Sequence, residues 1–500
     1  MKENDAFIEY RPGESLPLSQ IPRMHYYDFY NQASLEIDRQ AQVVHYFPLE
    51  DGGKKLLLLV LRKKSLHHKL LIGAAYAVND AISFTVRSKM FHLFEREIME
   101  ELNLRLHGHP WPKPLRKEIQ NYKLFTLQGS EVHEVGVGPV HAGVIEPGHF
   151  RFSAVGEEVK FLEIQLGYQH RGIEKLLPTL SLARMPTLIE GVAGDSAVSL
   201  ALLFANVIEG LTLGGGEGQG LPKSTADSIL RTLALELERS CNHIGDLGAL
   251  SGDVAFLPAA AYFGRMRGEV LNLLLQLSGN RFGKNLIRPF SYRIPLTKER
   301  AVTIIKKIDE VKREVEEVGA LLFSTPSVLA RFEHIGVLAH TTALKLGVVG
   351  VAARASNIDY DVRRDYPYEY YHDINVPVRS LAAGDVLSRA RIRYQESIDA
   401  LIISKNLLNH WISLDERATR AVAVPTLSAS SLVISLCEAW RGEMSLAAVT
   451  DSKGAIVKIK IKDPSFHNWA GLAYAMRGGE ISDFPLCNKS FNLSYCGVDL

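Results

Sequence analysis

Histidine and arginine side chains stand at two places along one short stretch of this sequence. The turn-forming pair Gly138-Pro139 lies beside His141, and the cationic pair His170-Arg171 comes just before a helical pattern. A histidine in a loop can donate a hydrogen bond, and an arginine supplies a fixed positive charge. The stretch therefore carries two polar clusters that could serve a binding site.

Two strands must position these clusters. The runs Phe150–Ala154 and Val159–Leu166 are rich in β-branched and aromatic residues, which is typical of strands. We expect them to form one hairpin that holds the His141 loop and the arginine pair at the margin of a larger body. A hairpin alone does not identify a reaction.

Length and composition exclude several classes of protein. A chain of 500 residues is too long for one ordinary core and predicts two to four domains. The net charge of +1 provides no global field for nucleic acid. No leader and no apolar run of membrane-spanning length is evident, and the four cysteines show no close pairing, so we expect a soluble, cytoplasmic chain.

The first 118 residues predict a small α/β module. Strands are expected at Val43–Phe47, Lys55–Leu61 and Ile82–Val86, and a helix at His92–Leu102. The prolines of His107–Lys117 then end the module. The charged positions of the helix are interpreted as a solvated face; they are Glu95, Arg96, Glu97, Glu100 and Glu101.

The rest of the chain predicts a bundle of helices with peripheral strands. Asp195-Ser196 is a plausible N-terminal cap for the first helix, and Ser224-Thr225 begins another. The glycine run at 214–220 lacks the pattern of a phosphate-binding loop and is interpreted as a plain loop. Helices are expected at Ala197–Leu211, from Ser224 past His243, and at Ala259–Leu277, Lys298–Leu322 and Leu387–Trp411, and a hairpin at Met444–Val449 and Ala455–Ile461.

The segments GPVHAG, PGHFRF and GYQHRGIEK resemble the opening of the large subunit of energy-converting nickel–iron hydrogenases and of its relative, the quinone-site (49-kDa-like) subunit of respiratory complex I. Residues 1–118 resemble the small (30-kDa-like) accessory subunit of complex I, fused ahead of the large-subunit body at 119–500. The tail from Asp483 to Tyr495 is similar to that of hydrogenase-4-like assemblies. The resemblance implies an α+β fold, with the α/β module followed by a mainly helical body.

The nickel–iron centre of the hydrogenase family is held by four cysteine thiolates, as a soft metal site requires. Aligned with the family's two CxxC motifs, this chain has Ala193 and Ser196 at the first motif and Ser465 and Asn468 at the second. The resemblance therefore implies the frame of a metal site without its ligands, and no nickel is expected.

The absence of nickel ligands favours the function of the related complex I subunit, which is electron delivery to a quinone. The resemblance places His141 in the loop that binds the quinone headgroup, with Gly138 and Pro139 completing its motif. The family's second donor is a tyrosine, and its position falls near Gly194, where this chain departs from the pattern. The alternative for His141 is a satisfied surface residue.

In relatives, residues like Arg171, His170 and His243 lie beside an iron–sulfur cluster held by a separate small subunit, where charge or hydrogen bonding raises its reduction potential. The alternatives are an Arg171–Glu174 ion pair and a histidine on a helix face. Arg354, Asp361 and Arg363 are interpreted as buried pairs, with proton handling as the other possibility. The tail aromatics, Phe484, Phe491 and Tyr495, are expected to dock on the chain's own core.

The sequence thus predicts a peripheral-arm subunit of a membrane-bound, complex I-like or hydrogenase-4-like NADH/quinone oxidoreductase. It would carry electrons from a partner's iron–sulfur cluster to a quinone and bind no cofactor through ligands of its own. Membrane partners would translocate ions, and the subunit would lie on the inner face of the cell membrane. A true nickel–iron hydrogenase and a non-catalytic scaffold remain the alternatives, and the electron donor and the pumped ion stay open.

Overall fold

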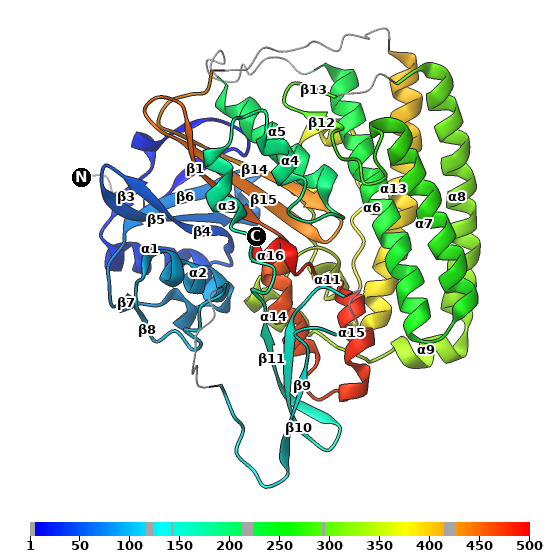
Figure 1. The fold of residues 1–500 in the computed structure, drawn as a ribbon, viewed down its shortest axis with the longest axis horizontal. Helices are drawn as coiled ribbons and strands as arrows, with labels where there is room; N and C mark the ends of the chain where they lie inside the picture. The colour runs from blue at the N-terminus through cyan, green and yellow to red at the C-terminus, as the bar shows by residue number, and fades with distance from the viewer. Residues whose placement is uncertain (1–5, 117–123, 142–144, 213–223, 293–295, 415–425) are drawn as a thin grey trace.

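A computed structural model of the chain describes residues 6–116, 124–141, 145–212, 224–292, 296–414 and 426–500. Helices and small sheets segregate, which confirms the expected α+β class. Figure 1 shows an N-terminal sheet on one side, a bundle of long helices on the other, and a narrow sheet that projects from the lower end. The predicted glycine loop at 214–220 lies outside the described residues.

The N-terminal sheet forms because one of its strands is apolar on both faces. All six residues from Leu56 to Leu61 are buried. Leu57, Leu59 and Leu61 pack beneath α1 (Tyr26–Asp38) and α2 (His92–Leu102), and the alternate residues face a second sheet. The strands are β1 (Ile8–Tyr10), β3 (Arg23–Met24), β4 (Gln42–Asp51), β5 (Lys54–Arg62) and β6 (Leu70–Tyr76), in the order β1-β6-β5-β4 with β3 beside β6.

The strand expected at Ile82–Val86 is wrong beyond its first residue. Only β7 (Ala81–Ile82) is extended, and it pairs with β8 (Leu106–His107). Phe84–Val86 is a 3₁₀ turn, because the Glu95 carboxylate accepts hydrogen bonds from the backbone N–H groups of Phe84 and Thr85. A buried carboxylate with several donors thus overrides the β-branched composition.

The predicted helix His92–Leu102 is confirmed as α2, but its solvated face is wrong for Glu95, Arg96 and Glu97, which are buried. Arg96 donates to the carbonyls of Lys113 and Pro114, and Glu97 forms ion pairs with Arg116 and Lys460. The face is charged because it contacts the rest of the chain through paired groups.

Long antiparallel helices form the body, and apolar residues at helical spacing join them into one core. Each predicted helix is confirmed with its ends shifted by at most two residues: α5 (Ala197–Leu211), α6 (Thr225–Asp253), α7 (Leu257–Ser278), α8 (Lys298–Ser324) and α13 (Val386–Ser413). The shorter helices are α3 (Ile173–Leu176), α4 (Met185–Ile189), α9 (Pro326–Phe332), α10 (His340–Leu346), α11 (Gly350–Ala355), α12 (Val362–Asp365), α14 (Ser465–Ala475), α15 (Phe484–Phe491) and α16 (Cys496–Asp499).

The predicted C-terminal hairpin is part of a larger sheet. β15 (Gly442–Thr450) pairs with β16 (Ile456–Lys462) as expected, but β14 (Ser431–Ala439) lies on its other side and pairs with β2 (Leu16–Pro17). The hairpin therefore does not pack on the bundle alone. This sheet lies between the N-terminal sheet and α5. The two-stranded sheet of β12 (Ile287–Arg288) and β13 (Ser291–Tyr292) completes the fold.

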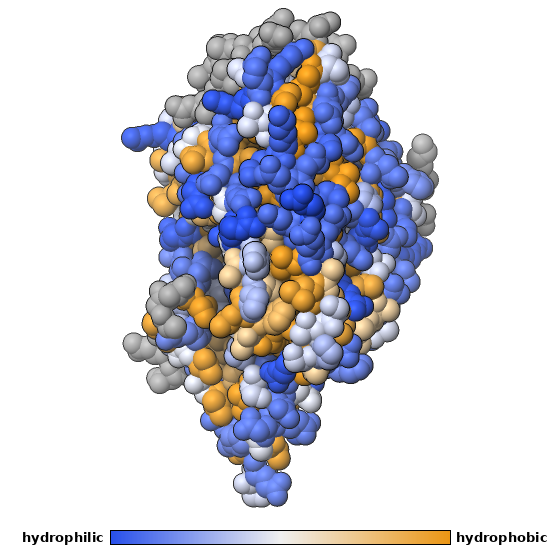
Figure 2. Space-filling model, turned by 90° about the vertical axis from the view of Figure 1, so that its right-hand side faces the viewer, coloured by the Kyte–Doolittle hydropathy of each residue, from blue (hydrophilic) through white to orange (hydrophobic). Residues whose placement is uncertain are grey.

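The projecting sheet contains the predicted hairpin, β10 (His149–Val155) and β11 (Glu158–Gln165), and a third strand, β9 (Val132–Val137). Figure 2 shows the helical side of the molecule as largely hydrophilic, with apolar residues gathered near its middle above this sheet. No helix among the described residues has the length and apolar character that crossing a membrane requires.

Candidate functional site

The loop that carries His141 joins β9 to β10 and is closed by its own backbone. The Gly148 N–H donates to the Pro139 carbonyl at 3.1 Å. Gly138 has a φ of +90°, and a Cβ there would lie 2.2 Å from the Gly148 oxygen, so only glycine fits. The His141 ring packs against Phe150, with the ring centres 5.7 Å apart.

Both ring nitrogens of His141 are buried and have no hydrogen-bond partner among the described residues. Such atoms are rare in folded proteins, where buried polar groups are nearly always paired. The hydroxyl of Tyr495 is in the same condition; Asn488 lies nearby but makes no hydrogen bond of normal geometry with it. Unpartnered donors of this kind suit a ligand with hydrogen-bonding oxygens.

Tyr495 was interpreted from the sequence only as a core-docking aromatic. Tyr495 is 5% exposed, and the other two tail aromatics, Phe484 and Phe491, are 8% and 3% exposed. The predicted docking of these aromatics on the core is therefore confirmed. Its ring lies 4.8 Å from that of Trp469 and 6.3 Å from that of Phe150, the ring that His141 also contacts. Burial raises the pKa of the phenol to about 12, so Tyr495 keeps its proton and remains a donor.

The C-terminal tail connects this loop to the predicted metal positions. The Tyr495 N–H donates to the carboxylate of Glu146 at 3.3 Å, and Glu146 lies in the same β9–β10 connection as His141. The Ser494 N–H donates to Ser465 Oγ at 2.9 Å, and the Ser494 carbonyl accepts from Trp469 Nε1. The predicted acceptor loop and the predicted metal frame are therefore neighbours, although about 300 residues of sequence separate them.

The four predicted metal positions are buried, and their polar atoms already have partners. Ser196 Oγ accepts from Trp440 Nε1 at 3.1 Å, and the Asn468 amide is paired with both backbone groups of Val349. Ala193 contributes only a methyl group. Hydroxyl, amide and methyl groups do not fit a nickel centre that needs thiolates.

A partly buried ion pair stands beside Ser196, with the Arg441 side chain 5% exposed and the Asp195 side chain 35% exposed. Arg441 donates to both carboxylate oxygens of Asp195, at 2.9 and 2.7 Å, and to the Asn492 carbonyl of the tail. Burial raises the pKa of Asp195, but the Arg441 guanidinium outweighs burial and holds the pKa below its usual range. The carboxylate is therefore ionised, and Arg441 joins the first predicted metal motif to the tail.

Arg171 does not pair with Glu174, so that expectation is wrong. Its guanidinium donates to the Gly191 and Val192 carbonyls, each at 2.8 Å, next to Ala193. Glu174 instead accepts from Lys460 at 3.0 Å. The carbonyls after α4 need donors, and Arg171 reaches them while remaining exposed at the surface.

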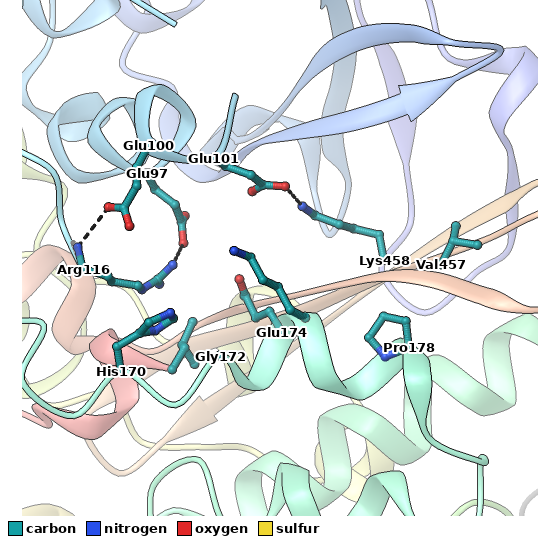
Figure 3. A pocket seen from close by; sticks show the side chains of 12 residues that line it. Glu97, Glu100, Glu101, Arg116, His170, Gly172, Glu174, Pro178, Val457 and Lys458 are labelled. Atoms are coloured by element: carbon teal, nitrogen blue, oxygen red, sulfur yellow. Dashed lines mark hydrogen bonds and ion pairs between the residues drawn. The ribbon is translucent and has the colours of Figure 1, made fainter. Parts of the chain in front are cut away.

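His170 lies at a charged pocket of about 350 Å³ between α2 and α3 (Figure 3). Its Nδ1 lies 2.8 Å from the Asp499 carbonyl. Across the pocket, Glu97 and Glu101 of α2 pair with Arg116 and Lys458. The pocket's charges are thus largely used to join the N-terminal part of the chain to the body.

His243 is on α6, as the helix-face alternative expected, but it is fully buried. Its Nε2 lies 3.1 Å from Glu396, and burial lowers its pKa. Its ring is 6.2 Å from that of Trp440, the residue that donates to Ser196. The structure therefore places His243 one layer behind the predicted metal frame and not on the surface with Arg171.

Buried ion pairs surround His243. Arg354 pairs with Glu396 and Glu438, each at 2.7 Å, and Arg363 pairs with Asp361 at 2.7 Å, which confirms the interpretation of these residues as buried pairs. Burial raises the pKa of Glu438 to about 7.

The N-terminus of α5 receives an unexpected cap. The helix begins at Ala197 after Ser196, as predicted, but the Ser196 side chain makes no capping bond. The carboxylate of Glu238, on α6, accepts instead from the N–H groups of Val198 and Ser199. Burial raises its pKa to about 7. A carboxylate distant in sequence supplied this cap, and no local pattern indicated it.

The family model of the 49 Kd subunit of respiratory-chain NADH dehydrogenase matches residues 253–431 and 417–500. Hydrogenase-4 component G of Escherichia coli (strain K12) is 27% identical over 436 residues, which cover 81% of this chain and 73% of the relative. Carbon monoxide-induced hydrogenase of Rhodospirillum rubrum is 27% identical over 72% of this chain and 97% of its own. NADH-quinone oxidoreductase subunit 4 of Thermus thermophilus is 26% identical over 71% and 90%. Hydrogenase and quinone-reductase relatives are thus about equally similar.

Proposed function

We propose that this chain acts as a peripheral oxidoreductase subunit of a membrane-bound, complex I-like assembly. The proposal rests on the family to which the chain belongs, which unites the 49-kDa subunit of respiratory-chain NADH dehydrogenase with hydrogenase large subunits. It passes electrons from an iron–sulfur cluster on a partner subunit to a quinone. Membrane subunits of the same assembly translocate ions, and this subunit lies against the inner face of the cell membrane.

One observation supports the quinone site above all others. The buried nitrogens of His141 and the buried hydroxyl of Tyr495 have no hydrogen-bond partner among the described residues, and both rings contact Phe150. A quinone headgroup has two carbonyl oxygens and takes up two protons, so it needs a donor near each. His141, on the loop of Gly138 and Pro139, binds and orients one oxygen. Tyr495 holds a proton at its hydroxyl for the other, in place of the tyrosine absent near Gly194.

The cluster side of the site is formed by Arg171 and His170. Both are exposed beside the tail, and Arg171 is fixed by two carbonyls, so its charge has one position. A fixed cation at this surface suits a partner that carries an anionic iron–sulfur cluster. His243 supports the same region from behind through Trp440. Residues 1–118 act as a fused accessory module.

Hydrogen chemistry is the rival function. Against it stand the groups at the four cysteine positions, Ala193, Ser196, Ser465 and Asn468, which offer no thiolate. A scaffold without catalysis is the second rival. The buried atoms of His141 and Tyr495 that have no partner within the described part of the chain favour an acceptor site over a scaffold, because leaving them unpaired has an energetic cost that a structural role does not explain.

The proposal is tested by photolabelling the assembled membrane complex with an azido-quinone. Labelled peptides from 138–150 and from 490–500, displaced by unlabelled quinone, are the expected result. Labelling confined to other subunits would contradict the acceptor site. Photolabelling of a His141→Ala complex, with assembly checked on a native gel, separates loss of binding from loss of the subunit.

A further inference from the structure

A large apolar cavity lies away from the His141 loop, where the N-terminal module meets β11 and α14. Its volume is about 740 Å³, within the range of small-molecule sites. Trp111 and Leu93 line it from the module, Phe161 from β11, and Trp469 and Tyr474 from α14. The cavity has room for an acyl-sized chain among aromatic walls.

Two cations mark one side of this cavity. Lys89 and Arg477 are both exposed and both line it. The Lys89 ammonium lies 4.7 Å from the centre of the Tyr474 ring, and the Arg477 guanidinium lies 4.1 Å from the same centre. The two positive charges therefore share one aromatic ring.

Within the described part of the chain, no carboxylate forms an ion pair with Lys89 or Arg477. Among the residues that the structure describes, neither Lys89 nor Arg477 has an ion-pair partner within 4.0 Å, whereas most other lysines and arginines near the module do. Glu163, the carboxylate found among the described residues of the cavity wall, is paired with Arg151 at 2.8 Å. Burial lowers the pKa of His92, so this lining histidine is neutral. The described cavity lining therefore carries an excess of positive charge next to Tyr474.

We propose that this cavity binds an amphipathic ligand that has an apolar chain and an anionic headgroup. The chain lies among Trp111, Phe161 and Trp469, and the headgroup meets Lys89 and Arg477. A free fatty acid and a membrane lipid with an acidic headgroup both have this combination of an apolar chain and an anionic group. Like charges held at one ring repel each other, and an anion between them removes that repulsion.

The cavity also touches the acceptor site through one residue. Trp469 lines the cavity, packs edge-on against Tyr495 and donates to the Ser494 carbonyl. The ligand therefore packs against the residue that holds the tail in place. This inference does not depend on quinone reduction, because it concerns binding at a separate cavity.

The test uses the assembled complex and a photoactivatable palmitate whose reactive group is on the chain. Labelled peptides should contain Trp111, Phe161 or Trp469. The double variant K89Q/R477Q should weaken labelling about tenfold, since charged contacts are lost. Lys54→Gln removes a comparable lysine, whose ammonium lies 5.3 Å from the centre of the Tyr76 ring and which does not line the cavity; it should leave labelling unchanged.

Competition distinguishes the ligand sources. Oleate and vesicles of phosphatidylglycerol should both displace the probe if the anionic group is recognised, and displacement by only one of them identifies the source. Oleyl alcohol should displace it much less well. Equal competition by oleyl alcohol, or unchanged labelling in K89Q/R477Q, overturns the proposal and indicates a cavity for a neutral chain. Ala473→Trp, which fills the cavity, should abolish labelling; persistent labelling in this variant also overturns it.

Discussion

Arg441 donates from both terminal nitrogens to the carboxylate of Asp195, at 2.9 and 2.7 Å, and from Nε to the carbonyl of Asn492. One side chain thus joins the loop before α5 to the C-terminal tail. Arg441 is 5% exposed, and the carboxylate of Asp195, whose side chain is 35% exposed, balances its charge. The pair lies next to Ser196, one of the predicted metal positions.

The purified assembly should contain no stoichiometric nickel bound to this subunit and should not take up hydrogen with a viologen dye. The reason is that no thiolate stands at the four positions predicted to align with the family's cysteines, which are Ala193, Ser196, Ser465 and Asn468. Elemental analysis and dye reduction measure both. One nickel per chain, or hydrogen uptake that depends on this subunit, would contradict the assignment.

Arg441→Met should destabilise the subunit by about 1.5–3 kcal/mol, because it removes two charge-assisted hydrogen bonds to Asp195, whose side chain is 35% exposed and so keeps part of its hydration. The double variant with Asp195→Asn should recover part of this loss. Thermal unfolding of the two variants and the wild type measures the effect. Arg313→Met is the control, because its pair with Glu317 is 3.8 Å long and exposed, and it should change stability by less than about 1 kcal/mol. Equal effects at both sites would refute a stabilising role for the Arg441–Asp195 pair.

Glu238 should make stability depend on pH in a definite direction. Its pKa rises from 4.5 to about 7 on folding, so the folded state binds the extra proton between these values. The contribution of Glu238 to the free energy of unfolding is full below pH 4.5 and is lost as the pH rises through 7. The loss is about 3 kcal/mol, because each unit of pKa shift corresponds to roughly 1.4 kcal/mol.

Glu238→Gln should therefore flatten the fall in melting temperature between pH 4.5 and 7. Glu97→Gln is the matched control, since Arg116 and Lys460 outweigh burial and hold the Glu97 pKa at about 2, so its contribution is lost only as the pH falls below 4.5. A Glu238→Gln protein with the wild-type pH profile would show that the Glu238 pKa is not raised.

Gly148→Ala should lower acceptor turnover while the complex still assembles. A Cβ at Gly148 would lie 2.5 Å from Tyr495 Cε1 and force the tyrosine ring to move. Gly264→Ala on α7, where a Cβ meets nothing within 4 Å, is the control. Turnover of quinone in membranes, normalised to assembled complex, is the measurement; equal rates in the two variants would exclude a role for the position of Tyr495.

Much of the fold was predictable because its signals are local. The helices at Ala197–Leu211 and His92–Leu102 have the predicted ends, since apolar spacing and adjacent breakers determine them. The 3₁₀ turn at Phe84–Val86 and the burial of Glu97 were not predictable. The turn depends on a nearby glutamate whose burial composition does not reveal, and the burial of Glu97 depends on an ion pair with Lys460, far along the chain.

The site was predictable in part for the same reason. His141 and Arg171 stand in short motifs. In the structure Arg171 contacts the Cys496 carbonyl of the tail, and His141 packs on Phe150, a ring that also contacts the tail residue Tyr495. Tyr495 was missed as a donor, because its neighbours Gly148 and Trp469 come from separate segments and only the fold leaves its hydroxyl unpaired. Its position next to the buried tail serine was the one available signal.

The most direct test of the account is quinone reduction by membranes that carry His141→Ala in a fully assembled complex. Loss of a buried hydrogen bond should weaken acceptor binding by about 1–3 kcal/mol, roughly five- to a hundredfold in KM, with assembly unchanged on native gels. His133→Ala, an exposed histidine on β9 of the same sheet, should behave as the wild type. Unchanged acceptor kinetics in His141→Ala would contradict the assignment of this loop as the quinone site and favour a scaffold.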